Sequence, residues 1–99
     1  MGISTEYRCF INNKKCVGVC LYKPEYYSTL SYVPIEIITY FLDQLLIIIP
    51  FERFVVDIFI IPGDNKVHFI EINPFDETTD TFSFDYEEIN KATHLLVKL

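Results

Sequence analysis

The sequence predicts an α+β fold: a mostly antiparallel sheet with helices packed on one face. Short runs rich in β-branched and aromatic residues occur in pairs separated by turn residues, which is typical of β-hairpins. Two other stretches carry helix signals, namely an amphipathic pattern from Ile35 to Leu46 and an acidic cap at Asp85. With 99 residues, the chain is expected to form one domain over residues 1–99.

The first two strands are expected at residues 5–11 and 15–21, and Asn12-Asn13 supply the turn of this N-terminal hairpin. Arg8 is the residue of interest in the first strand. A guanidinium is a rigid fork of donors that matches a phosphate. The alternative to a binding role for Arg8 is a surface arginine paired with Glu6 or another acid.

A helix is expected from about Ile35 to Leu46 or beyond, because Pro34 suits a first helical turn and Pro50 ends the apolar run. The apolar face of this helix is unusually wide, so we expect other parts of the protein or a partner to bury it on more than one side. Packing under the sheet is the favoured interpretation. A homodimer through helix 35–46, or contact with a protein partner, is the alternative for the remaining surface.

The central hairpin is predicted from two apolar runs, residues 54–61 and 67–72, joined by turn residues. A loop centred on Asp64 sets Asp57 directly opposite Glu71, with their Cβ atoms about 4.5–5.5 Å apart. Asn73 lies on the same face, one pleat further along. In this register His68 faces away from the two carboxylates.

Asp57, Glu71 and Asn73 stand where apolar side chains are expected. Two carboxylates this close repel each other, and a divalent cation between them removes that cost. Magnesium prefers one or two carboxylates and takes its other ligands from water and substrate phosphates. These three residues therefore form a candidate magnesium site; the alternative is a solvated sheet face with scattered polar side chains.

After the sheet, Asp85 and Glu88 have capping-box spacing, which predicts a C-terminal helix from about Tyr86 to Val97.

The composition argues against several classes of protein function. The net charge of −6 and the absence of any basic run longer than Lys14-Lys15 argue against nucleic-acid binding. No apolar run reaches the roughly 18 residues of a membrane span. Three cysteines without CxxC spacing favour free thiols and a cytoplasmic location.

One ordered set of motifs resembles a known family. Glu71-Ile72-Asn73-Pro74-Phe75 is followed by Thr79-Asp80 and, without a gap, by a run ending at Glu87-Glu88-Ile89. Upstream, Glu6-Tyr7-Arg8-Cys9-Phe10 resembles the Glu-Phe-Arg-Cys-Phe strand of the same proteins. Together these segments resemble the homologues of cell division cycle protein 123, which are ATP-grasp proteins that assist assembly of translation initiation factor 2.

The resemblance implies that this chain corresponds to the C-terminal lobe of an ATP-grasp fold. Asp57, Glu71 and Asn73 would then bind Mg²⁺ that bridges the phosphates of ATP, and Arg8 would contact those phosphates. The expected protein partner is a translation factor or the first lobe, which supplies the phosphate-binding lysines and the adenine-binding hinge. Without that lobe, tight ATP binding and activity by this chain alone are not expected.

Two alternatives remain open. Glu71 stands where the family usually has Asp, and Glu-Ile-Asn is closer to ligase-type ATP-grasp proteins, which favours a fragment of an enzyme. The other alternative is a non-catalytic protein-interaction module that keeps a vestigial nucleotide site and binds its partner through the wide apolar helix.

Overall fold

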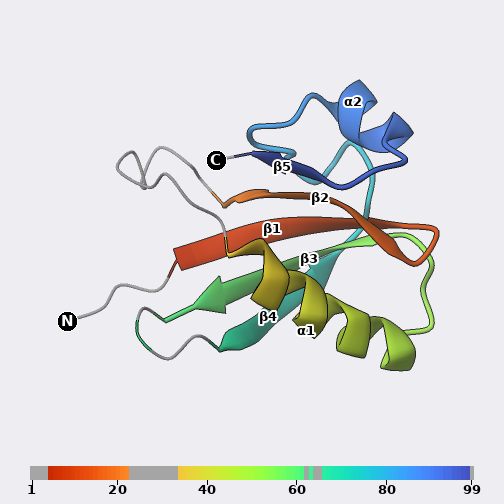
Figure 1. Cartoon of the computed structure of the whole chain (residues 1–99). Coiled ribbons are helices and arrows are strands. Elements are labelled where there is room, and N and C mark those ends of the chain that lie inside the picture. Colours follow the sequence, from red (N-terminus) through yellow and green to blue (C-terminus); the bar gives the residue numbers. More distant parts are fainter. Residues whose placement is uncertain (1–4, 23–33, 62, 64–65, 99) are drawn as a thin grey trace.

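The computed structural model describes residues 5–22, 34–61, 63 and 66–98 (Figure 1). They form a five-stranded sheet in the order β4-β3-β1-β2-β5, in which only the β2–β5 pair is parallel. The α+β class and the mostly antiparallel sheet are therefore confirmed. The elements are β1 (Thr5–Asn12), β2 (Lys15–Leu21), α1 (Ile35–Ile48), β3 (Phe54–Ile60), β4 (Val67–Asn73), α2 (Tyr86–Lys91) and β5 (Leu96–Lys98).

The N-terminal hairpin of β1 and β2 forms as predicted, but its turn lies one residue later than expected. Asn13 and Lys14 have φ angles of 53° and 59°, the left-handed conformation that two-residue hairpin turns require. Asn12 pairs with Lys15 to close the hairpin. The Lys14 amide donates to the carbonyl oxygen of Glu52 at 2.9 Å, which ties this turn to the segment that enters β3.

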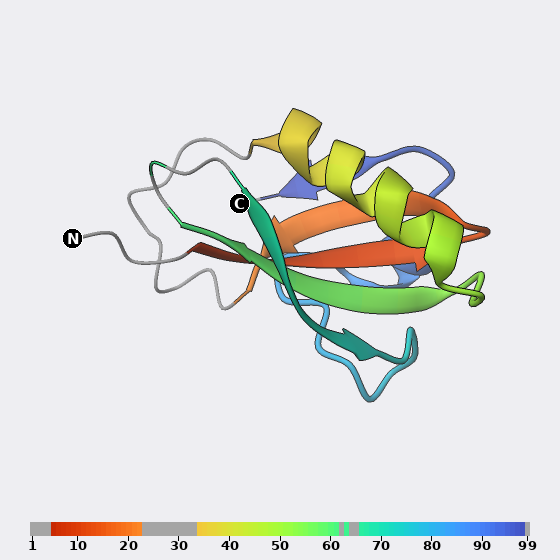
Figure 2. The same cartoon turned by 90° about the horizontal axis from the view of Figure 1, so that it is seen from below.

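One face of the sheet packs against α1, which crosses that face in Figure 2. Ile38 and Leu42, one helical turn apart, are fully buried against alternate residues of the central strands, including Cys9 and Ile58. The predicted helix is confirmed and continues to Ile48. Among the described helices, none is long and apolar enough to span a membrane.

The opposite face is covered by α2 and by the loop that precedes it. Phe10 of β1 packs edge-to-face against Phe75 and Phe84, with ring centroids 5.6 and 5.7 Å apart, and Ile89 of α2 joins this second core cluster. The two helices thus lie on opposite faces, whereas we expected them on one. The reason is that β1 places Cys9 on one face and Phe10 on the other, and both of these apolar side chains need cover.

Gly18 of β2 allows α2 to approach the sheet closely. A Cβ atom at this position would collide with Cδ1 of Ile89 and would lie 3.2 Å from the ring of Phe84. Because glycine has no side chain, the helix and the aromatic loop can pack directly on the β2 backbone. This contact sets how α2 sits over the second face.

The predicted C-terminal helix from Tyr86 to Val97 is wrong in its second half. It begins after Asp85 as expected, although that side chain makes no capping hydrogen bond, and it ends at Lys91. Ala92 is extended, and residues 96–98 form β5 beside β2. Leu96 still packs on the second core cluster, but it does so from a strand. Pairing with the free edge of β2 outweighs the local helix preference.

Candidate functional site

The central hairpin places Asp57 directly opposite Glu71 and Val55 opposite Asn73, so the predicted register is confirmed at these residues. Asp57, Glu71 and Asn73 therefore share one face of the sheet. Toward the turn a β-bulge shifts the pairing by one residue. His68 consequently lies opposite Phe59 and stacks on its ring at 4.7 Å, on the face of Asp57, which corrects the expected orientation of this histidine.

Arg8 and Asp57 form a buried, two-pronged ion pair across β1 and β3. Arg8 Nε donates to Asp57 Oδ1 at 2.8 Å, and Nη2 donates to Oδ2 at 2.9 Å. Arg8 is 6% exposed and Asp57 is 1% exposed. Asn73 adds a third donor, because its Nδ2 donates to Asp57 Oδ2 at 3.0 Å. Such charge-assisted bonds hold the carboxylate of Asp57 in one orientation.

The surroundings of Arg8 connect this pair to the loop after β4. Its Nη1 donates to the carbonyl oxygen of Asp80 at 2.8 Å. The ring centroids of Tyr22 and Phe82 each lie 4.9 Å from the guanidinium carbon of Arg8. These cation–π contacts favour the charged form of Arg8. Burial disfavours the charged form, but the hydrogen bonds and charge of Asp57 outweigh it, so the pKa of Arg8 is raised. Arg8 therefore stays charged inside the fold.

Glu71 differs from Asp57 in its environment. It lies on the edge strand β4, where its side chain is exposed, whereas Asp57 lies on the inner strand β3. Glu71, Asp57 and the amide of Asn73 together offer the hard oxygen donors that magnesium takes from proteins. Asn73 turns its nitrogen toward Asp57, so a shared cation would require its amide group to rotate. Among the described residues, no group of three or more His, Cys, Asp or Glu side chains could hold a metal ion.

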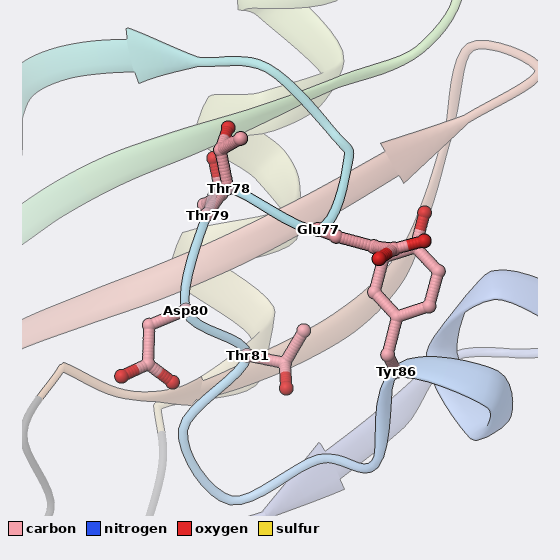
Figure 3. Close-up of a pocket in the computed structure, with 6 residues that line it drawn as sticks. All are labelled: Glu77, Thr78, Thr79, Asp80, Thr81 and Tyr86. Atoms are coloured by element: carbon pink, nitrogen blue, oxygen red, sulfur yellow. The ribbon is translucent and has the colours of Figure 1, made fainter.

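The loop that joins β4 to α2 lines an open pocket of about 420 Å³ (Figure 3). The side chains of Glu77 and Tyr86 point toward one another on one side of it, while that of Asp80 points to the other side. Thr79 Oγ1 donates to the carbonyl oxygen of Pro74 at 2.6 Å, which helps to keep the loop in this shape. The carbonyl oxygen of Asp80 also accepts a hydrogen bond from Arg8. Asp80 therefore connects the pocket to the buried ion pair of Arg8 and Asp57.

Sequence reasoning missed the aromatic residues around Arg8. Tyr22 follows β2 at the alternation that places it on the Arg8 side, and this signal was available. Phe82 was not predictable, because its φ of 51° and the hydrogen bond that its backbone N–H donates to Asp80 Oδ1 at 2.7 Å define a tight turn without glycine. The side chain of Asp80 supports this turn by accepting that hydrogen bond.

Three comparisons place the chain among known proteins. The D123 family model matches residues 1–97. A translation initiation factor eIF2 assembly protein of Danio rerio is 28% identical over 95 residues, which is 91% of this chain and 27% of the relative. The protein of the same name from Xenopus laevis is 34% identical over 91 residues, 87% of this chain and 27% of that relative. The chain thus spans about a quarter of these relatives, in their C-terminal part.

The fold has a counterpart among solved structures. C-terminally truncated Cdc123 from Schizosaccharomyces pombe superposes with a TM-score of 0.72 at 24% sequence identity, over 95% of this chain and 40% of that chain. Cdc123 from the same organism gives a TM-score of 0.71 at 22% identity. At these identities the likeness shows a shared fold.

Proposed function

The chain belongs to the D123 family, and from this membership we propose that it supplies the magnesium- and phosphate-binding part of an ATP-grasp protein that assists assembly of translation initiation factor 2. The names of the relatives support the assembly role. The observation that carries the nucleotide site is the grouping of Asp57, Glu71 and Asn73 on one sheet face, with a buried arginine bound to the innermost carboxylate.

In this proposal each residue has a distinct part. Asp57 and Glu71 hold the magnesium ion through carboxylate oxygens, and Asn73 contributes its amide oxygen after rotation. Bound magnesium supplies the positive charge that neutralises and bridges the phosphates of ATP. Arg8 orients Asp57 and, among the described residues, uses three of its five N–H groups on Asp57 and Asp80; we assign the other two to a phosphate.

Protein partners follow from the same premise. The proposed partner is a cytoplasmic translation factor or a first ATP-grasp lobe, since this chain matches only about a quarter of its relatives. A homodimer through helix α1 stays a second prediction, and light scattering of the purified chain tests it.

Thermal unfolding with ATP and Mg²⁺ tests the nucleotide site. A ligand present at one hundred times its Kd should stabilise the fold by about 2.7 kcal/mol. Glu71→Gln should abolish the stabilisation by ATP and Mg²⁺, because it removes a carboxylate that the proposal assigns to magnesium. Since Glu71 is exposed, the change spares the buried ion pair. Glu77→Gln, a change of another exposed acid, is the matched control and should keep the stabilisation.

A second experiment uses a chimera, in which this chain replaces the matched segment of the Danio rerio relative. The rest of that relative then supplies the first lobe. ATP binding by that chimera and its loss in Glu71→Gln would support the assigned ligand. If neither the isolated chain nor the chimera binds ATP, or if binding survives Glu71→Gln, the proposed site is wrong.

One observation favours the alternative of a non-catalytic interaction module. The Asp57 carboxylate is already bound by Arg8 and Asn73, and no buried side-chain nitrogen or oxygen among the described residues lacks a partner. The site is thus satisfied without a cation, as expected of a vestigial one. A ligase-type enzyme fragment, suggested by Glu71, stays a prediction that an ATP-hydrolysis assay of the chimera tests.

A further inference from the structure

Helix α1 carries two apolar stripes, of which the sheet uses one. The first stripe contains Ile38 and Leu42, both buried in the core. The second is displaced by about a quarter of a turn or more and reads Ile37, Tyr40, Phe41 and Ile48, at the i, i+3, i+4 and i+11 spacing of a helix-packing face. Ile37 and Phe41 are half-buried at the edge of the core, whereas Tyr40 is 70% exposed and Ile48 is 76% exposed, so this stripe is only partly covered within the described fold.

The second stripe forms one wall of an apolar groove. A cavity of about 490 Å³ lies between Ile37, Tyr40 and Phe41 of α1 and the start of β4 at Val67. Strand β4 is at the edge of the sheet, so the groove lies beside the free edge of the sheet.

The floor beyond this cavity is also apolar. Phe69 and Ile72 pair with Ile58 and Val56, whose side chains belong to the α1 side of the sheet, yet Phe69 is 47% exposed and Ile72 is 37% exposed. Neighbouring helices pack about 8–10 Å apart, and strands are about 4.8 Å apart. One helix covers about two strands, so the uncovered strip beside α1 fits one further helix.

Charge selects the kind of helix. Glu36 and Asp43 are exposed on the outer side of α1, and α1 contains no lysine or arginine. A second copy of α1 would bring the same acids against these acids, which disfavours a homodimer. Lys66 lines the other wall of the groove, at the start of β4. A partner helix therefore needs basic residues only on the flank that faces α1.

We propose that the groove between α1 and β4 binds an amphipathic α-helix of a partner protein, with its apolar stripe on Tyr40, Phe41 and Phe69. Basic residues on one flank of that helix lie along Glu36 and Asp43. Helix-in-groove binding of this kind uses apolar anchors at i, i+3, i+4 and i+7. The groove lies on the α1 face, and its use does not depend on nucleotide binding at Asp57 on the other face.

Two synthetic peptides of about 18 residues, about 27 Å long as helices, test this interface. They share one leucine stripe and differ only in their flank, which carries Lys and Arg in one and Glu in the other. In fluorescence anisotropy the basic peptide should bind at least tenfold more tightly than the acidic one, and less tightly at high salt. In NMR of the ¹⁵N-labelled chain, its binding should shift amides of α1 and β4.

Variants separate the groove from other apolar surface. Tyr40→Asp should weaken binding of the basic peptide at least tenfold, whereas Leu95→Asp, at an exposed leucine outside the groove, should not change it. Glu36→Lys should reduce the preference for the basic peptide. Equal binding of both peptides, binding that survives Tyr40→Asp, or binding of neither peptide would overturn the proposal. A dimer of the chain that Tyr40→Asp dissociates, and that the basic peptide does not displace, would also overturn it.

Discussion

The two faces of β1 and β3 are built from alternate residues of the same strands, yet they differ in chemistry. On the α1 side Cys9 and Ile58 are fully buried in a purely apolar core. On the other side Arg8 and Asp57, their immediate sequence neighbours, are also buried, but they are charged. The strand alternation thus separates a face packed with apolar side chains from a face on which the second core cluster lies beside a buried ion pair.

This difference indicates what each face is for. Apolar burial contributes about 25 cal/mol per Å² removed from water. A buried ion pair loses about as much in desolvation as it gains in attraction, and replacing both partners by apolar residues is often neutral or stabilising. The charged face is therefore explained by function rather than by stability, which is a hypothesis that mutation of the pair tests.

Breaking the ion pair should have the largest effect. Arg8→Met leaves Asp57 buried without its main partner and should reduce the free energy of unfolding by about 3–5 kcal/mol in urea denaturation. The double change Arg8→Met with Asp57→Leu should recover most of this loss. If the double variant is as unstable as the single one, the pair is required for stability and the contrast between the two faces fails.

A cavity on the α1 face should cost nearly as much. Ile38→Ala removes a fully buried side chain from the apolar core and should lower the free energy of unfolding by about 2–5 kcal/mol. Ile47→Ala on the same helix is the control, because Ile47 is 77% exposed and its loss should cost about 0.5 kcal/mol or less. Similar losses in both variants would contradict the assignment of the core stripe.

Overpacking the charged face near α2 should have an intermediate effect. Gly18→Ala places a methyl group against Cδ1 of Ile89 and should cost about 1–3 kcal/mol. Ile89→Val removes the colliding atom, so the double variant should be more stable than Gly18→Ala alone. If Ile89→Val only adds to the loss, the close contact between β2 and α2 is not what the glycine provides.

The smallest effect is expected at the rim of the same face, where Lys98 of β5 donates to Glu88 of α2 at 2.8 Å. This hydrogen bond lowers the pKa of Glu88, so its stabilisation is present above the ordinary value of 4.5 and is lost as the pH falls. Lys98→Ala should lower the unfolding midpoint slightly at pH 7 and not at pH 3. An equal decrease at both pH values would point to lost packing on Phe84 instead.

Local patterns predicted the parts of the fold that local forces decide. The two hairpins and α1 follow from periodicity and turn residues, so their bounds were nearly right. The end of α2 was wrong because β5 forms by pairing with β2, far away in sequence. The placement of the helices was wrong because Cys9 and Phe10 are both apolar, so the pattern of β1 does not identify a single buried face.

The candidate site shows the same limit. Arg8, Asp57 and Asn73 were each singled out by chemistry, but the pairing of Arg8 with Asp57 depends on β1 lying next to β3, which local patterns do not reveal. An ion pair with some acid was the alternative for Arg8, without Asp57 being named as the partner. The roles in metal and phosphate binding stay predictions.

The β-bulge between Asp57 and Ile58 has a consequence for how this protein can change through evolution. Pairs on the turn side have residue numbers that sum to 127, while Asp57 and Glu71 sum to 128. A bulge places one extra, unpaired residue in one of the two strands. An insertion or deletion in the segment that joins β3 to β4 could thus be absorbed at Ile70, before it reaches Glu71 and Asn73. Relatives with connections of different length could keep the same three donors aligned.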